Sequence, residues 1–231
     1  MKLILKILQS IDNIVTYLFS NLSNEKKFIK SFFGKKKITL VDVGANLGGY
    51  TDFIIKNIDT NEIHIFEPSK KCFEYLKKKF YKNKININNK ALSNSNKIKT
   101  FYENEVLSQS SLNNKRNKFN SHLENINVYK VECLTLDKYF RNKKNIIDLL
   151  KIDAEGEDLK VLKGATNLLV KKRIKLIKVE LLNSFNVKKN KSNINDIIFF
   201  LNKYNYYIIT ITKTKFVDEK LLMMDVYFCS K

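Results

Sequence analysis

An apolar run that ends in a glycine turn and continues at once into a helical pattern constrains this chain most. The run is VDVGANLGGYT, from Val41 to Thr51. In open α/β sheets, ligands bind at the carboxyl ends of the strands, at the mouth of such a turn. A second apolar strand follows, IHIFE, and ends in Glu67. An acid about 20 residues after the turn can accept hydrogen bonds from ribose hydroxyls. Together the two features predict a site for a cofactor that contains a nucleoside.

The spacing of the glycines narrows the class of cofactor. A dinucleotide-binding turn reads G-x-G-x-x-G, and its second glycine lets the backbone approach a pyrophosphate. Here Gly44 and Gly49 occupy the first and third positions, but Asn46 occupies the second. A side chain there argues against NAD and FAD and leaves room for a nucleoside without a pyrophosphate, such as S-adenosylmethionine. A P-loop is excluded because no Gly-Lys-Ser/Thr follows the turn. A tight turn without a ligand is the plainer alternative, which Glu67 disfavours.

The composition is that of one globular domain, with 231 residues, 44% hydrophobic and 29% charged. A net charge of +20 raises the question of nucleic-acid binding. Nearly all of the positive charge is lysine, whereas arginine is preferred for bidentate recognition of phosphates and bases. We therefore expect no DNA partner and disfavour RNA. The three cysteines are far apart and show no C-x-x-C spacing, which indicates neither a disulfide framework nor a zinc site.

Residues 1–34 are predicted to form an N-terminal amphipathic helical segment. Its apolar residues recur at helical spacing, at Leu3, Ile7, Ile11, Ile14 and Leu18. A signal peptide is disfavoured because polar residues interrupt the segment and no small-residue cleavage site follows. Lys2 and Lys6 are few charges for a membrane-surface anchor, so packing on the domain or on a partner chain is favoured. We expect a cytoplasmic protein, with weak peripheral contact at the inner membrane surface as the alternative.

Strand and helix patterns alternate over residues 35–231, the predicted main domain. The strands expected are Ile38–Val43, Ile63–Phe66, Ile85–Asn89, Ile146–Ile152, Ile174–Leu181, Tyr206–Thr212 and Leu221–Cys229. Helices are expected from about Tyr50, from Ser69, over Leu159 to Leu169, and over Ile194 to Leu201. This alternation predicts a mostly parallel sheet with helices on both faces. No helix separates the last two strands, which predicts a hairpin with one antiparallel strand.

Residues 97–136 interrupt the alternation and are predicted to form a β insert after the third strand. The insert holds two strand patterns, Ile98–Tyr102 and Val128–Thr135, separated by the polar stretch SQSSLNNKRNKFNSHLEN. A loop this long inside a compact domain is usually functional or disordered. A substrate lid and a Lys/Asn-rich insert without a role are both left open.

A second motif, LLKIDAEGEDLKVLKGATNLL, lies over residues 149–169. Its strand is apolar enough to be central and delivers Asp153 and Glu155 to the carboxyl edge of the sheet, close to the glycine turn. Glu157 and Asp158 suit the positive end of the following helix, which predicts a helix start for them. A carboxylate at a strand end beside a cofactor can orient a hydroxyl or accept its proton.

The motifs together resemble the FkbM family of S-adenosylmethionine-dependent methyltransferases. VDVGANLGGYT, FEPS, KALSN, TLDKYF and KIDAEGEDLKVLKGA follow one another in the family's order, over about residues 38–182. The resemblance implies a Rossmann-like, seven-stranded class I methyltransferase fold and mostly O-methylation of sugars, glycan precursors or secondary metabolites. It also implies that Asp42, Gly44, Asn46 and Gly48 line the methionine part of S-adenosylmethionine, that Glu67 holds its ribose, and that Ala91, Leu92 and Ser93 lie near its adenine.

Catalysis is assigned to Asp153 first and to Glu155 second, with Glu180 as a third acid at the same edge. No metal is expected. The alternative is Mg²⁺ held by Asp153, Glu180 and Asn183, since oxygen ligands suit a hard cation.

The acceptor is inferred from absent motifs. Amino-methylases of nucleobases carry Asp/Asn-Pro-Pro-aromatic after the fourth strand, where this chain reads Asp153-Ala154-Glu155-Gly156. The Pro-Cys nucleophile of cytosine C5 methylation is also missing. A hydroxyl on a small molecule or glycan is therefore the expected acceptor. The alternatives are an RNA methyltransferase and, from another class, a non-catalytic basic module that binds RNA or a membrane. The oligomeric state is left open.

Overall fold

The computed structural model describes residues 24–104, 110–112, 125–182, 194–217 and 220–230. The strands are β1 (Ile38–Val43), β2 (Thr60–Phe66), β3 (Ile85–Asn88), β4 (Ala91–Leu92), β5 (Ile98–Asn104), β6 (Asn125–Leu134), β7 (Ile147–Ile152), β8 (Ile174–Leu182), β9 (Tyr206–Val217) and β10 (Lys220–Ser230). The helices are a helix over residues 24–33, α2 (Gly49–Asn57), α3 (Lys70–Lys79), α4 (Leu136–Tyr139), α5 (Asp158–Lys163), α6 (Thr166–Val170) and α7 (Ile194–Asn202).

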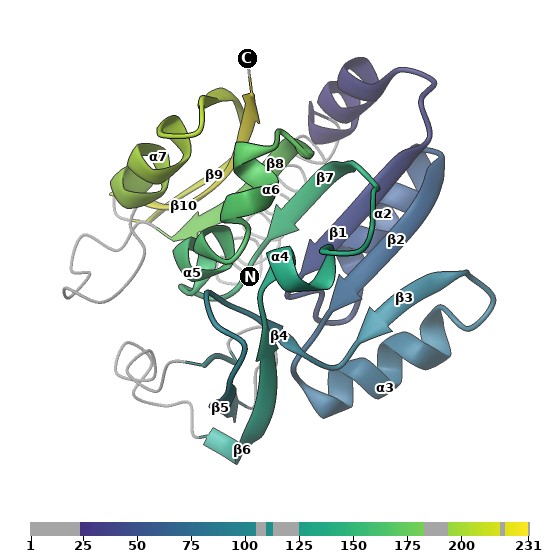
Figure 1. The fold of residues 1–231 in the computed structure, drawn as a ribbon, viewed down its shortest axis with the longest axis vertical. Helices are drawn as coiled ribbons and strands as arrows, with labels where there is room; N and C mark the ends of the chain where they lie inside the picture. Colours follow the sequence, from purple (N-terminus) through teal and green to yellow (C-terminus); the bar gives the residue numbers. More distant parts are fainter. Residues whose placement is uncertain (1–23, 105–109, 113–124, 183–193, 218–219, 231) are drawn as a thin grey trace, which may run out of the picture.

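A seven-stranded sheet forms the centre of the molecule, in the order β3-β2-β1-β7-β8-β10-β9 (Figure 1). The pairs from β3 to β8 are parallel, whereas β10 is antiparallel to both β8 and β9. The predicted α/β fold and the predicted terminal hairpin are confirmed. The strand order reverses between β1 and β7, and ligands bind at such a reversal in open α/β sheets.

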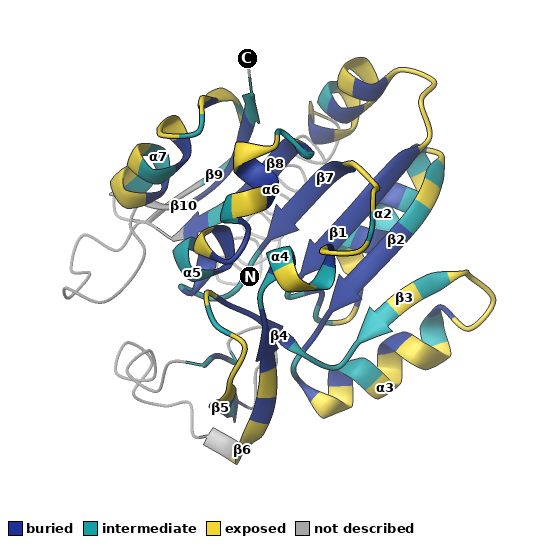
Figure 2. Ribbon diagram, in the orientation of Figure 1, coloured by how far each residue is buried: buried dark blue, intermediate teal, exposed yellow. Residues whose placement is uncertain are grey.

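Helices cover both faces of the sheet, so its central strands are buried on both sides (Figure 2). Every residue of β1 and of β7 is buried. One core lies under α2, α3 and the helix over residues 24–33 and includes Leu40, Ile54 and Leu149. The other lies under α4 to α7 and includes Leu150 and Leu162. The near-continuous apolar runs of the parallel strands reflect this two-sided burial.

The predicted insert forms a smaller sheet together with β4, which precedes it, in the order β4-β6-β5. Both expected strand patterns form strands, and β5 and β6 pair antiparallel, while the short strand β4 lies parallel to β6. Of the long polar loop between them, the structure describes residues 110–112, where Ser111 forms a bridge with Tyr102. The proposed lid otherwise falls outside the described residues and stays a prediction.

The single helix predicted after β7 is two helices, α5 and α6, so that expectation is wrong in detail. The break falls at Gly164, where an added Cβ would lie 2.1 Å from the carbonyl oxygen of Ser93. Here the backbone passes too close to the segment after β4 for a larger residue. The two short elements β4 and α4 were not predicted, because two to four residues are too few to show a period.

Only the end of the predicted N-terminal segment lies in the described residues, as the helix over residues 24–33. Its Ile29 and Phe33 are buried in the core beside Ile38 and Leu40. The apolar stripe from Leu3 to Leu18 lies outside the described residues. In the part of the chain that the structure describes, no helix is long and apolar enough to cross a membrane.

Candidate functional site

The glycine turn lies at the carboxyl end of β1, against the end of β7. Gly44 has a φ of 69°, and an added Cβ would lie 1.9 Å from the carbonyl oxygen of Asp153. Asn46 is also in the left-handed region, at φ 51°, which asparagine tolerates better than most residues. Because Gly44 has no side chain, the backbone of the turn lies closer to the end of β7 than any other residue would allow.

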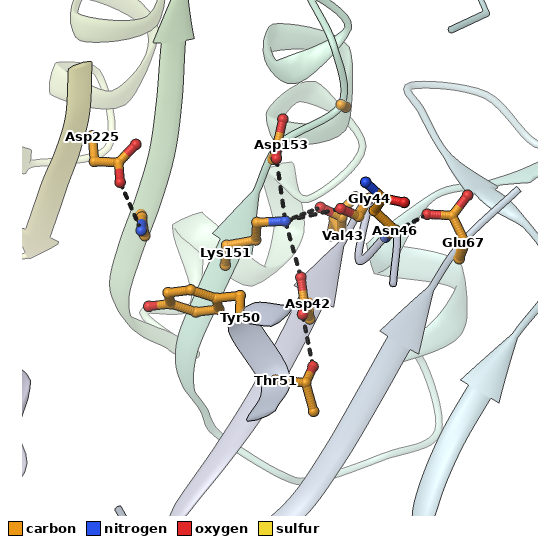
Figure 3. A network of polar contacts seen from close by, with 12 residues as sticks. Asp42, Val43, Gly44, Asn46, Tyr50, Thr51, Glu67, Lys151, Asp153 and Asp225 are labelled. Carbon is orange, nitrogen blue, oxygen red and sulfur yellow. Dashed lines mark hydrogen bonds and ion pairs between the residues drawn. The ribbon is translucent and has the colours of Figure 1, made fainter. Parts of the chain in front are cut away.

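Glu67 connects the turn to the end of β2. Its Oε2 accepts a 2.8 Å hydrogen bond from the backbone amide of Asn46, and its Oε1 accepts one of 2.8 Å from the amide of Ser69. The side chain is only 5% exposed. Burial raises the pKa of Glu67 to about 7, although both amide bonds act to lower it. The two predicted cofactor motifs thus meet in one place (Figure 3).

A cavity of about 80 Å³ opens between these motifs and the insert; we call it the cofactor-side cavity. It is lined by Val43, Gly44, Asn46, Phe66, Glu67, Pro68, Ala91, Leu92, Phe101, Ser110, Ser111, Leu112, Asp153, Ala154, Glu155 and Glu157. Five of the predicted cofactor residues are in this set: Gly44, Asn46, Glu67, Ala91 and Leu92.

The other three predicted cofactor residues lie behind the cavity wall. Asp42 is fully buried and accepts a 2.7 Å hydrogen bond from Oγ1 of Thr51. Gly48 faces the side chains of helix α3, where an added Cβ would lie 2.7 Å from Phe80. The backbone amide of Ser93 donates to the carbonyl of Leu134. These residues shape the turn and the β4 segment without reaching the cavity surface.

The two predicted catalytic acids both line the cofactor-side cavity, and only Asp153 also reaches a second one. Asp153 lines the cofactor-side cavity and also a second cavity beyond the glycine turn. Glu155 lines only the cofactor-side cavity, and its backbone is left-handed at φ 55°. Asp158 begins α5 and accepts the amides of Ala154 and Gly156, while Glu157 precedes the helix, as predicted. The turn that carries Asp153 is thus held by α5.

The second cavity, of about 300 Å³, lies under α2 and the start of the helix over residues 24–33; we call it the acceptor-side cavity. It is lined by Glu25, Gly44, Ala45, Asn46, Gly49, Tyr50, Phe53, Lys151, Asp153, Lys178, Glu180, Lys213 and Asp225. It shares Gly44, Asn46 and Asp153 with the cofactor-side cavity, so the two cavities meet at the glycine turn.

Lys151 joins β7 to the turn. Its ammonium group lies 3.2 Å from Oδ1 of Asp42 and 3.5 Å from Oδ2 of Asp153, and it donates 2.9 Å to the carbonyl of Gly44 (Figure 3). Burial alone would lower the pKa of Lys151, but the charge of Asp42, then that of Asp153, raises it above its usual value. The ammonium therefore stays charged and holds both carboxylates beside the turn.

Lys178 forms a second buried ion cluster, one strand further along. Its Nζ lies 2.7 Å from Oε1 of Glu25 and 2.9 Å from Oδ2 of Asp225, and 4.4 Å from the centre of the Tyr50 ring. Tyr227 also donates its hydroxyl to Glu25. The cluster ties the helix over residues 24–33 to the floor of the acceptor-side cavity.

Sequence reasoning found Asp42 and Asp153 but missed both buried lysines and the partners of Lys178. The signal was present, because Lys151 and Lys178 interrupt apolar runs that predict fully buried strands. Charged residues are almost never fully buried unless they are paired. Their partners Glu25 and Asp225 carry no such signal.

No cluster of three histidine, cysteine, aspartate or glutamate residues is placed to hold a metal ion within the described ranges. The alternative Mg²⁺ set includes Asn183, which lies outside those ranges. His64 is fully buried in β2, and its Nδ1 lies 2.9 Å from the hydroxyl of Tyr139.

A family model described as the methyltransferase FkbM domain matches residues 42–208. The chain belongs to the FkbM methyltransferase family. The matched region starts at the glycine turn and includes the carboxyl ends of β1 and β7, where the two cavities meet. The family resemblance seen in the motifs is therefore confirmed. Comparison with curated proteins gives no significant match.

Solved structures similar to this FkbM chain share its class I methyltransferase fold. A methyltransferase FkbM from Methylobacillus flagellatus KT superposes with a TM-score of 0.54 at 13% identity, over 83% of this chain. This chain spans 43% of that protein. Magnesium protoporphyrin IX methyltransferase from Synechocystis PCC 6803, solved with S-adenosylhomocysteine, gives 0.52 at 7% identity, over 91% of this chain and 82% of that one. An rRNA methylase from Streptococcus thermophilus gives 0.51 at 7% identity, over 93% and 96%. At such identities the likeness concerns the fold.

Proposed function

We propose that this FkbM-family chain binds S-adenosylmethionine and transfers its methyl group to a hydroxyl of a sugar, a glycan precursor or a secondary metabolite. The observation that carries the proposal is the meeting of two cavities at the glycine turn, with Asp153 lining both. One cavity has the features of a nucleoside site, and the other leaves space for an acceptor beside it.

The residues of the cofactor-side cavity fit the cofactor. Each carboxylate oxygen of Glu67 accepts one backbone amide, and a carboxylate oxygen can accept a second hydrogen bond, here from a ribose hydroxyl. Gly44 lines the cavity where the methionine part would lie, and its lack of a Cβ lets the turn pack against Asp153. Leu92 and Phe101 supply apolar surface at the far end, which suits a base. Asn46, on the rim, would contact the ribose or the methionine part.

The bound cofactor would supply an electrophilic methyl group on a sulfonium centre. The chain would then have to place the acceptor oxygen in line with it, and positioning of this kind can lower a barrier by about 7–11 kcal/mol. Asp153 is proposed to orient the reacting hydroxyl from the junction of the two cavities. Lys151 would hold Asp153 in place through their ion pair.

An RNA methyltransferase is the second candidate, supported by the net charge of +20. The acceptor-side cavity does not share that charge, because carboxylates of Glu25, Asp153, Glu180 and Asp225 line it together with three lysines. These carboxylates would repel the phosphate groups of an RNA chain. A non-catalytic basic module is the candidate from another class, and the two joined cavities count against it.

Two measurements test the proposal. Calorimetric titration with S-adenosylmethionine should show binding that Glu67→Ala abolishes or weakens strongly, while Glu74→Gln, an exposed acid on α3, leaves it unchanged. Labelled methyl groups should then pass to a cell-envelope glycan fraction and not to total RNA, and Asp153→Asn should slow the transfer. Absence of cofactor binding would refute the proposal. Label in RNA alone would favour the second candidate.

A further inference from the structure

The floor of the acceptor-side cavity is a row of charged side chains that runs across three strands of the sheet. Asp225 on β10 lies directly opposite Glu180 on β8, and Lys213 on β9 lies directly opposite Asp225. Residues opposite each other in antiparallel strands share a face, with Cβ atoms about 4.5–5.5 Å apart. Asp153, at the end of β7, lines the same cavity. Three carboxylates and one lysine therefore follow one another along this edge.

Two of these carboxylates already have cationic partners, and the third does not. Lys151 lies 3.5 Å from Asp153, and Lys178 lies 2.9 Å from Asp225. Among the described residues, no hydrogen bond or ion pair engages the carboxylate of Glu180, although it lines the cavity. The Oδ1 atom of Asp225, which is buried, also has no hydrogen-bond partner there. A buried acceptor such as this Oδ1 is costly unless a donor satisfies it.

We propose that Glu180 is the carboxylate that binds the reacting hydroxyl of the acceptor and takes its proton. The inference rests on the proposed function. In the step, the hydroxyl oxygen forms a bond to the methyl carbon while the bond from that carbon to sulfur breaks, and its electron pair stays on sulfur as a thioether. The proton leaves the oxygen for Glu180. The unpaired Oδ1 of Asp225 accepts a hydrogen bond from a neighbouring hydroxyl or ammonium group of the substrate. The substrate is therefore neutral or cationic at this point.

The surroundings suit a base that works near neutral pH. Burial, then the charges of Asp153 and Asp225, raise the pKa of Glu180 to about 7, against smaller effects of Lys213 and Lys151. The other charged or titratable groups that line the cavity are Lys178, Glu25 and Tyr50. A general base is most effective when its pKa lies near the working pH. Asp153, by contrast, is held in an ion pair and is suited to orient the acceptor.

The first test is the pH profile of labelled-methyl transfer to the cell-envelope glycan fraction. The cofactor is kept saturating at every pH, so that pH-dependent binding through Glu67 does not contribute. Wild-type activity should then rise with pH through about 7, because the base must lose its proton. Glu180→Gln should lower the rate about 10²-fold or more and abolish the rise, with unchanged affinity for S-adenosylhomocysteine. Asp225→Asn removes a negative neighbour and should move the rise to lower pH. Lys213→Met removes a positive neighbour and should move it to higher pH. A purely structural role would not produce opposite shifts.

The second test needs no turnover. A carbodiimide with an amine labels accessible carboxylates, and mass spectrometry locates the labels. Glu180 should be labelled with S-adenosylhomocysteine bound and protected when the glycan fraction is added, whereas exposed Glu74 should be labelled in both cases. The inference is overturned if Glu180→Gln keeps the wild-type pH profile, or if the glycan fraction does not protect Glu180. If the wild type transfers no methyl group to any fraction, the proposed function fails and the inference falls with it.

Discussion

The backbone amide of Asn46 donates a 2.8 Å hydrogen bond to Oε2 of Glu67, across 21 positions of sequence. The bond closes the glycine turn of β1 onto the end of β2. It places a buried carboxylate beside the residue that replaces the second glycine of a dinucleotide turn. The cofactor-side cavity begins at this contact.

Cofactor affinity should increase with pH because of Glu67. Burial raises the pKa of this carboxyl to about 7, and ribose hydroxyls would donate to its ionised form. Binding should then release protons, so affinity for S-adenosylhomocysteine should rise as pH rises through about 7. Glu67→Gln should bind about tenfold or more weakly, with no such rise. Calorimetry in two buffers of different ionisation enthalpy measures the proton release. A flat wild-type profile would contradict the prediction.

Gly44 should tolerate no side chain. Gly44→Ala places a Cβ 1.9 Å from the carbonyl oxygen of Asp153 at a positive φ, so the turn must move away from β7. We expect a loss of more than about 2 kcal/mol in the free energy of unfolding, since the left-handed conformation alone costs 1–2 kcal/mol. Cofactor affinity should fall as well. Gly49→Ala is the matched control, because nothing lies within 4 Å of its added Cβ. Equal stability of the two variants in urea unfolding would refute this account.

Lys151 should be essential for stability at the junction of β1 and β7. Lys151→Met leaves the fully buried Asp42 without its cation, and breaking a buried pair in this way costs about 3–5 kcal/mol. Urea unfolding would measure the loss. The double variant Asp42→Asn/Lys151→Met should recover part of it, because the fully buried position 42 then carries no unpaired charge. Lys77→Met is the control, since its pair with Glu74 is exposed and should contribute less than about 1 kcal/mol.

Glu25 should fix the helix over residues 24–33 to the sheet. Its Oε1 accepts from both Lys178 and Tyr227, and its side chain is 8% exposed. Glu25→Gln keeps the shape but loses the charge, so we expect a loss of about 1.5–3 kcal/mol in the free energy of unfolding. Exposed Lys27→Gln should be neutral. Thermal and urea unfolding of the two variants provide the comparison. A stable Glu25→Gln protein would mean that packing of Ile29 and Phe33 alone holds the helix.

Most of the fold could be predicted because its signals are local. The seven strands of the main sheet were expected within a few residues, since runs such as ITLVDV are apolar along their whole length. The acids and glycines at the strand ends were found for the same reason. The sequence did not predict β4 and α4, because both elements are short. It also did not predict the break at Gly164, because that break depends on how closely the backbone of Ser93 approaches.

The amino-acid sequence by itself determined the cofactor half of the site. Gly44, Asn46 and Glu67 lie in two consecutive strand ends, and consecutive parallel strands place their ends together. Only the tertiary structure decided the acceptor half. Glu180, Asp225 and Lys213 form a row because β10 inserts between β8 and β9, and Glu25 joins them from a helix 153 positions before Lys178. Strand order and long-range ion pairing are set by the burial of the whole sheet, which no local pattern in the sequence records.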